Sequence, residues 1–296
     1  MQCVNTLDLS SSQVGAGSLP SLYYFPNYID EAEEQRILKE VHASQAKWVQ
    51  LSGRRLQNHG GIVHSKGLIP AHTPRWLEQL SARIHRALLP LFGEQPPNHV
   101  LINSYQPGCG IMPHEDGPLY HPVVSILSLG SPAVLRFWRK QEEGGTGNAP
   151  AVASVLAMPR SLLVFTDEAY HSCLHGIEEV TEERLDASVV NPEALEQQQQ
   201  QHHHQGHQQE TQQQTQQQRQ QQGQASCGET CAPPAAQGNS VGEAQQGDGC
   251  SGSFGDGSSG CGTDAITLSV PRQGARVSLT IRRVLRVHKA LGLLKR

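Results

Sequence analysis

A glutamine-rich stretch in the second half of the chain limits what this sequence can fold into. Between Gln197 and Gln224, 18 of 28 residues are Gln, and the next forty are mostly Gly, Ser, Ala and Gln. Such a composition lacks the apolar side chains that a hydrophobic core needs. Taking residues 186–267 as one low-complexity insertion leaves 214 of 296 residues for folding, which is enough for one sizeable domain. We expect the chain to leave that domain near 186 and return near 268, since long surface loops add little closure entropy.

Charge and cysteine content also separate the insertion from the rest. The net charge is −4, but the insertion holds nine acidic residues and a single Arg, so the remainder has 22 basic against 18 acidic residues. Residues 272–296 contain eight Lys or Arg and no acid. This pattern indicates a phosphate-binding surface or a nuclear import signal, or else charges that serve a buried site and solvent. The chain has seven cysteines, an odd number, and four of them lie in the insertion. A disulfide-stapled secreted scaffold would be shorter and denser in Cys, so we expect reduced thiols and a location in the nucleus and cytoplasm.

The first hundred residues predict a lead followed by two helices. Residues 1–19 have no apolar pattern and are expected to be disordered. Asp30, with Glu three positions later, matches a helix-capping pattern, and a second helix is expected to begin near Pro74. Between them, residues 48–70 are rich in Gly, Arg, Asn and Gln and predict a strand-and-loop surface element. We assign residues 20–96 to this N-terminal part.

After Pro97 the sequence changes to short β-type runs separated by Gly and Pro. The runs lie at residues 99–105, 123–129, 133–138, 161–166 and 276–284. Their spacing is typical of an all-β sandwich or barrel, and not of alternating strands and helices. The predicted core therefore comprises residues 97–185 and 268–296. No apolar run reaches 18 residues, so a transmembrane helix and a membrane partner are not expected.

The segment His114-Glu115-Asp116 is a candidate metal site. In an extended segment, residues two apart face the same way, so His114 and Asp116 point together. Two His and one carboxylate on one face of an ion leave positions open, which suits Fe(II) oxygen chemistry. A third ligand would come from a later strand, where His171 and His175 are both candidates.

The last predicted strand alternates strictly between polar and apolar residues. Arg276, Ser278, Thr280 and Arg282 fall on one face, and the residues between them are Val, Leu and Ile. A polar face of this kind is common on the wet side of an antiparallel strand. Two Arg on that face would instead suit the grip of a small dicarboxylate, because guanidinium binds carboxylate with two parallel hydrogen bonds.

In this order, the motifs resemble the AlkB family of Fe(II)/2-oxoglutarate dioxygenases. The stretches NSYQPGCGIMPHEDGPLY, AYHSCLHGI and RVSLTIRRV carry the resemblance, which covers residues 22–185 and 272–296. The resemblance implies a mostly β fold with flanking helices. It takes the form of a double-stranded β-helix (jelly roll), with the long insertion before its last core strand.

The resemblance also implies the cofactors and their ligands. It assigns Fe(II) to three residues: His114, Asp116 and His175. The resemblance places the distal iron-binding His in the LHGI stretch, so His175 is preferred to His171. It assigns 2-oxoglutarate, a co-substrate together with O2, to five residues: Asn103, Tyr105, Arg276, Ser278 and Arg282. Arg276 is expected on the distal carboxylate and Arg282 nearer the end that chelates iron.

The resemblance further implies that segment 48–70 corresponds to the lid that AlkB proteins lay over a nucleotide. Its predicted substrate contacts are Arg54, Arg55, Gln57 and Asn58. The implied partner is RNA or single-stranded DNA, bound by a monomer. One position departs from the family pattern: base-repairing relatives carry an acidic residue two positions after the metal-binding Asp, where this chain has Pro118. The preferred base therefore does not follow from the resemblance.

Three functions fit these residues. The first is oxidative demethylation of N-alkylated nucleic acid, in which 2-oxoglutarate is converted to succinate and CO2 and the hydroxylated methyl group leaves as formaldehyde. The second keeps the chemistry but applies it to a protein or a small molecule. The third is a nucleic-acid-binding module with little turnover. The intact set of metal and co-substrate residues favours the first two.

Overall fold

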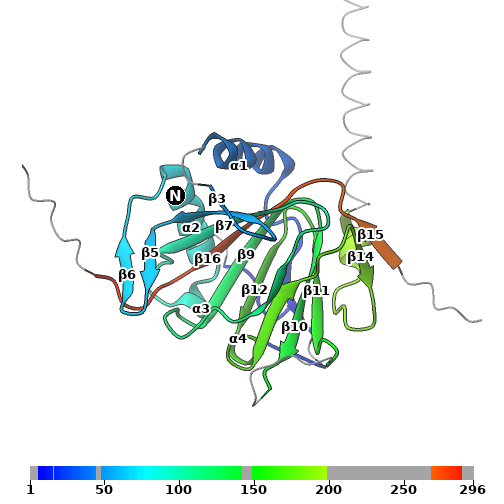
Figure 1. Ribbon diagram of the computed structural model, residues 1–296. Coiled ribbons are helices and arrows are strands. Elements are labelled where there is room, and N and C mark those ends of the chain that lie inside the picture. Colours follow the sequence, from blue (N-terminus) through cyan, green and yellow to red (C-terminus); the bar gives the residue numbers. More distant parts are fainter. Residues whose placement is uncertain (1–5, 16, 45–47, 142–148, 199–267, 289–296) are drawn as a thin grey trace, which may run out of the picture. The chain divides into compact units, whose positions relative to one another are not determined.

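An eight-stranded sheet forms the centre of the fold and contains most of the predicted strands. The computed structural model describes residues 6–15, 17–44, 48–141, 149–198 and 268–288, all in one unit (Figure 1). The eight antiparallel strands follow in spatial order: β1 (Gln13–Val14), β2 (Leu22–Phe25), β12 (Leu162–Thr166), β9 (Val123–Gly130), β16 (Arg276–Arg282), β7 (His99–Tyr105), β4 (Arg55–His59) and β3 (Val49–Gln50).

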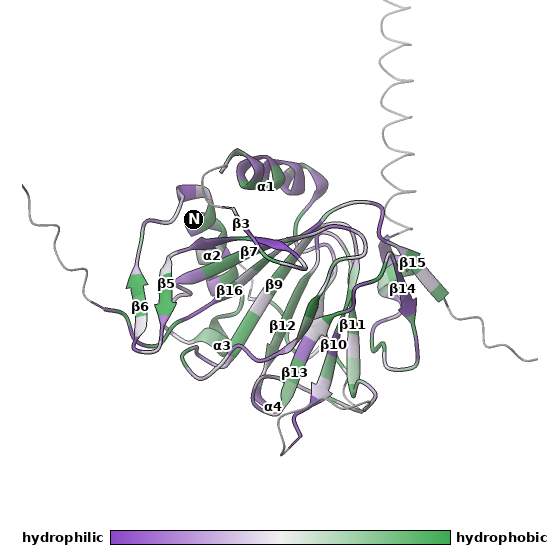
Figure 2. Cartoon of the chain, in the orientation of Figure 1, coloured by the Kyte–Doolittle hydropathy of each residue, from purple (hydrophilic) through white to green (hydrophobic). Residues whose placement is uncertain are grey.

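A smaller sheet faces one side of the large one. Its four antiparallel strands are β11 (Ala153–Ala157), β10 (Ala133–Arg139), β13 (Cys173–Ile177) and β8 (Ile111–His114). Phe137 of the small sheet and Phe165 of the large sheet meet edge to face at 5.4 Å between ring centroids, and both are buried. The two sheets thus form the sandwich that the β-type runs predict, with a hydrophobic core between them (Figure 2).

Helices cover the opposite face of the large sheet. They are α1 (Glu31–Ala43), α2 (Arg75–Ala87) and the short α3 (Leu89–Phe92), while α4 (Asp167–His171) follows β12. Asp30 caps α1 by accepting a hydrogen bond from Glu33 N at 2.7 Å, as predicted. The side chain of Glu33 turns instead to Arg83 of α2, at 2.7 Å. None of the described helices is long and apolar enough to cross a membrane.

Strict alternation in β16 gives the large sheet two different faces. Val277, Leu279 and Ile281 lie in the cluster under the helices and are at most 1% exposed. The polar residues between them therefore face the small sheet, where the core would otherwise be apolar. The last run was predicted to extend to 284, but β16 ends at Arg282 and Val284 makes only an isolated bridge.

Two small antiparallel pairs flank the sandwich. One is the hairpin of β5 (Gly61–His64) and β6 (Gly67–Pro70), and the other pairs β14 (Glu182–Leu185) with β15 (Leu268–Pro271). The second pair joins a strand that precedes the insertion to the strand that follows it. Residues 182–185 and 268–271 are thus neighbours in the fold, although 82 residues separate them in sequence.

Two predicted boundaries need correction. The lead expected at 1–19 contains β1, and Leu19 within it is fully buried in the core. The insertion expected from 186 begins later, because residues 186–198 pack on the fold. The predicted end of the core at 296 stays a prediction, because residues 289–296, like 199–267, lie outside the described residues.

Asn191 explains why residues 186–198 belong to the folded part. Its side chain is fully buried, accepts a hydrogen bond from Leu156 N at 2.8 Å and donates one to Leu156 O at 3.0 Å. The amide thus imitates a neighbouring strand along β11. Polar composition concealed this role, because Asn in a polar stretch is typical of a loop.

Replacement of Asn191 by Ala should lower the free energy of unfolding by about 1–3 kcal/mol, because both backbone groups of Leu156 would be buried without partners. Urea unfolding measures the change. Glu196→Ala, at an exposed position nearby, is the control and should have no effect. Equal stability of the two variants would contradict the assignment of residues 186–198 to the folded part.

Candidate functional site

Two adjacent strands of the small sheet bring the predicted metal ligands together. His114 of β8 and His175 of β13 are register partners, with ring centroids 4.3 Å apart. Asp116 lies in the loop directly after β8. One donor atom from each of the three residues falls within 4.8 Å of the other two. The cluster therefore has the ligand types and spacing of a site for one divalent cation.

Local contacts set the orientation of these ligands. His114 Nδ1 lies 2.9 Å from the carbonyl oxygen of Met112, so Nδ1 must donate and Nε2 is left to bind a metal. Gly176 allows β8 to approach closely, since a Cβ there would lie 2.8 Å from Ile111 O. Tyr170 of α4 donates to Gly117 O at 2.7 Å and holds the turn that follows Asp116.

The electrostatics of the cluster favour metal-binding protonation states. Burial lowers the pKa of His175 to about 4 and also lowers the pKa of His114, so both rings are neutral near pH 7. Burial opposes ionisation of Asp116, but Arg282, His175 and His114 together outweigh it and lower the pKa of that carboxyl. A carboxylate and two neutral imidazoles result.

The polar face of β16 lines a cavity of about 230 Å³ that contains the cluster. Arg276 and Arg282 stand at the two ends of that face, and both are buried. Arg276 Nη2 donates to Ser128 Oγ at 3.1 Å, and Arg282 donates to Asp116 Oδ1. The two guanidinium groups therefore converge on one cavity, although their Cα atoms are six residues apart.

The strand next to β16 supplies the other predicted co-substrate residues. Tyr105 and Asn103 of β7 are the register partners of Arg276 and Ser278, and both line the cavity. The guanidinium of Arg276 lies over the ring of Tyr105, 5.6 Å from its centroid. All five predicted 2-oxoglutarate residues thus face the cavity, and Thr280 joins them.

Comparison with known proteins identifies the family of this chain. The model of the 2OG-Fe(II) oxygenase superfamily matches residues 62–220. "Probable RNA/DNA demethylase ALKBH6" of Danio rerio is 42% identical over 195 residues, which cover 64% of this chain and 82% of that protein. The chain belongs to the AlkB family of 2OG-Fe(II) oxygenases.

Two further proteins match this chain at lower sequence identity. "Alkylated DNA repair protein ALKBH8 homolog" of Arabidopsis thaliana is 27% identical over 183 residues, covering 54% of this chain and 51% of that protein. The solved structure of OsALKBH1 has a TM-score of 0.42 at 14% identity, over 55% of this chain and 88% of that one.

The residues of this AlkB protein fit the Fe(II) and 2-oxoglutarate of its family. Within the part of the chain that the structure describes, several buried polar atoms without hydrogen-bond partners lie in this cavity: Arg276 Nε, Arg282 Nε and Nη2, and Asp116 Oδ2. The guanidinium atoms suit the oxygens of a dicarboxylate, and the carboxylate oxygen suits a cation. Burial lowers the pKa of Arg276, which makes an anionic partner favourable there.

The four predicted substrate residues have different surroundings. Arg55 is stacked on Trp48, with its guanidinium 4.6 Å from the ring centroid. Arg54 instead enters the cavity and donates to Asn103 Oδ1 at 3.0 Å. Asn58 is exposed, and its Oδ1 lies 2.8 Å from His99 Nε2.

Gln57 corrects the prediction of a substrate contact. It is fully buried and donates to Val41 O at 2.9 Å and to Ser44 O at 3.4 Å. These carbonyls lie at the C-terminal end of α1, where no helical donors remain. Gln57 therefore attaches α1 to the sheet and does not reach the surface.

Tyr120 and His99 form a layer behind the site that sequence analysis missed. The guanidinium of Arg282 lies 4.1 Å from the Tyr120 ring centroid, and the Tyr120 hydroxyl lies 3.3 Å from His99 Nδ1. Burial lowers the pKa of His99 to about 3. The register that places His99 opposite Arg282 is visible only in the paired strands, so the sequence carried no direct signal for it.

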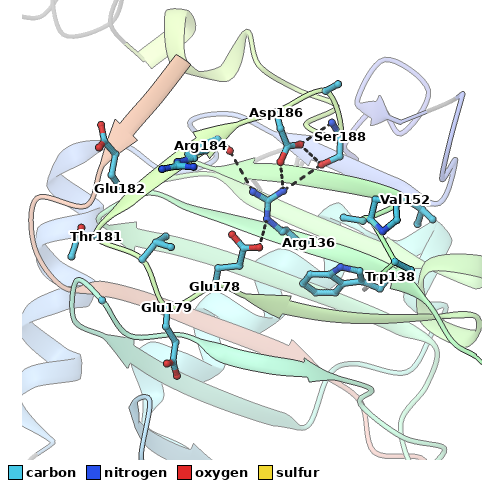
Figure 3. Close-up of a pocket in the computed structure, with 16 residues that line it drawn as sticks. Arg136, Trp138, Val152, Glu178, Glu179, Thr181, Glu182, Arg184, Asp186 and Ser188 are labelled. Atoms are coloured by element: carbon cyan, nitrogen blue, oxygen red, sulfur yellow. Dashed lines mark hydrogen bonds and ion pairs between the residues drawn. The ribbon is translucent and has the colours of Figure 1, made fainter. Parts of the chain in front are cut away.

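A larger hollow of about 1270 Å³ lies apart from the metal ligands, beside β10 and β14 (Figure 3). Arg136 at its centre donates to Asp186 at 2.8 Å and pairs with Glu178 at 3.2 Å. The dashed lines of Figure 3 also reach the Arg184 carbonyl and Ser188. These contacts tie β10 to the segment around β14, which is a structural role.

The metal assignment predicts which histidines are required for metal binding. His114→Ala and His175→Ala should each abolish stoichiometric binding of Mn(II), used as a surrogate for Fe(II), since each removes one of three ligands. Equilibrium dialysis followed by metal analysis measures the stoichiometry. His171→Ala is the control, because His171 is exposed at the end of α4. Loss of binding in the His171 variant with retention in the His175 variant would contradict the assignment.

The buried, neutral His99 predicts how stability depends on pH. In the unfolded chain His titrates near pH 6.5, whereas folded His99 takes up a proton only near pH 3. The free energy of unfolding should therefore fall as pH drops through this window, by up to about 1.4 kcal/mol per pH unit from this residue. Urea unfolding of the metal-free protein from pH 7 to pH 4.5 should show a shallower slope for His99→Gln. Parallel slopes would contradict the prediction.

Proposed function

We propose that this AlkB protein oxidatively demethylates N-alkylated nucleic acid, in the form of RNA or single-stranded DNA. The observation that carries the proposal is the 42% identity, over most of its length, to a relative named as a probable RNA/DNA demethylase. The metal and co-substrate residues of the family are present together in one cavity. The lid strands β3 and β4, with the aromatic Trp48 and the basic Arg55, lie at the edge of the large sheet.

Bound Fe(II) and 2-oxoglutarate would supply the oxidation: O2 converts 2-oxoglutarate to succinate and CO2, and one oxygen atom enters a substrate C–H bond. A hydroxylated N-methyl group then breaks down to formaldehyde and the unmodified base. Arg276 would hold the distal carboxylate of the co-substrate with Ser128 beside it. Arg282 would hold the end nearer the metal and keep Asp116 ionised.

The lid strands β3 and β4 offer a surface for a nucleobase. Trp48 and Arg55 are stacked on each other there, and Val49 and Leu51 are exposed large apolar residues of the same strand region. Aromatic and guanidinium planes bind unpaired bases by stacking, with little dependence on base identity. A base inside a duplex would first have to be extruded, so a single strand is the favoured substrate.

A succinate-release assay tests the proposed function. The protein is incubated with Fe(II), 2-oxoglutarate and a panel of methylated RNA and single-stranded DNA oligonucleotides, and formaldehyde is measured in parallel. We expect matched release of succinate and formaldehyde with at least one methylated oligonucleotide. Asp116→Ala is the control without turnover. The proposal would be overturned if a methylated protein or small molecule stimulated succinate release and no oligonucleotide did.

The lid predicts a contribution of Arg55 to nucleic-acid affinity. Arg55→Ala should weaken binding of a single-stranded oligonucleotide and reduce the slope of log affinity against log salt by about 0.7, if Arg55 neutralises one phosphate. Fluorescence anisotropy at several salt concentrations measures both quantities. Arg36→Ala removes the same charge from an exposed position of α1 and should leave them unchanged. Equal slopes in both variants would exclude a phosphate contact by Arg55.

A further inference from the structure

Two adjacent arginines of the lid have separate surroundings. Arg55 stacks on Trp48, whereas Arg54 lines the same cavity as Asn103, Tyr105 and the metal ligands. We infer that Arg54 is a positioning residue for 2-oxoglutarate, which fixes the side-chain amide of Asn103 and links the lid to co-substrate binding. The inference rests on the co-substrate of the family and does not depend on which substrate the protein oxidises.

The chemistry of the contact determines the orientation of Asn103. A guanidinium group has only donors, so the atom of Asn103 that meets Arg54 Nε at 3.0 Å must be the carbonyl oxygen. The amide nitrogen is then left to donate to another group. Without Arg54 the amide could turn over and present its oxygen to an anionic ligand, which would be repulsive. Arg54 thus selects the orientation of Asn103 that suits a carboxylate.

Strand pairing places this amide between the lid and the co-substrate strand. Asn103 of β7 is the register partner of Leu56 on β4 and of Ser278 on β16. Arg54 directly precedes β4, so its side chain reaches Asn103 from the lid side. Ser278, assigned to the co-substrate, lies on the other side. Asn103 is 7% exposed, and a buried amide of this kind requires partners for its polar atoms.

The turn that carries Arg54 lies against the backbone just before β8, the strand that carries the metal ligand His114. Leu51 N donates to Arg54 O at 2.8 Å, which closes the turn between β3 and β4. Gly53 rests against the backbone before β8, since a Cβ there would lie 2.6 Å from Gly110 O. The tip of the lid is therefore seated at the cavity and not free above it.

The charge of Arg54 also acts on the co-substrate end of the cavity. Burial raises the pKa of Tyr105, and the positive charges of Arg276 and Arg54 oppose that rise. Arg54 is thus within electrostatic reach of the groups assigned to the distal carboxylate. By reciprocity, a co-substrate that binds better when Arg54 is in place also stabilises the seated lid.

The test is a double-mutant cycle read by binding. Isothermal titration of the Mn(II)-loaded protein with 2-oxoglutarate, without any substrate, gives the affinity of each variant. Arg54→Ala should weaken binding about five- to tenfold, the size of one lost hydrogen bond with its reorganisation. Arg54→Lys, which keeps a donor without the planar fork, should lose less. Arg36→Ala, which removes an exposed guanidinium group from α1, should stay within twofold of the wild type.

The cycle with Asn103 separates positioning from a general structural effect. If Arg54 acts through Asn103, Arg54→Ala should add almost nothing in the Asn103→Ala background. An equal loss in both backgrounds, or unchanged affinity of Arg54→Ala in the wild-type background, would overturn the inference. Because no nucleic acid is present, failure of the proposed demethylation would leave this measurement intact, and the two failures are distinguishable.

Discussion

The ion pair between Asp116 and Arg282 is the contact on which the site depends. It joins the loop after β8 of the small sheet to β16 of the large sheet, and both side chains are at most 5% exposed. Burying two charges costs on the order of several kcal/mol for each ion, so such a pair is not retained for stability alone. Here it holds one carboxylate oxygen, keeps the group ionised, and leaves the other oxygen beside two neutral imidazoles. The donor set for a divalent cation follows from this arrangement.

A polar cavity inside a β-sandwich requires a hydrophobic core elsewhere. The large sheet meets this need by facing two ways. Its helix-covered face packs Leu127, Val277 and Leu279 against α1 and α2, which gives the fold a second apolar cluster besides the one between the sheets. The cavity side can then carry serines, arginines and an amide in the middle of the strands, where each has a strand neighbour to bond or a ligand to bind.

The long, regular strands were predictable, and the partners across sheets were not. The run at 99–105 coincides with β7, and the alternation of β16 correctly separated its two faces, because both depend only on neighbours in sequence. Short strands such as β8 and β13 have no such signal, and their pairing rests on Gly176 allowing close approach. Gln57 was misplaced for the opposite reason. A polar side chain was taken as a surface group, but the end of α1 needed a buried donor.

Arg54 and Arg55 show how strand geometry divides neighbouring residues between two tasks. Successive side chains of an extended segment point to opposite faces, so one arginine enters the cavity while the next stacks on Trp48. In sequence the pair resembles a single basic patch, and we predicted both as contacts to a nucleic acid. The Arg54–Asn103 bond assigns the first to the co-substrate side instead. A change of both residues together would therefore alter two binding events at once, and only single variants can tell the lid's two faces apart.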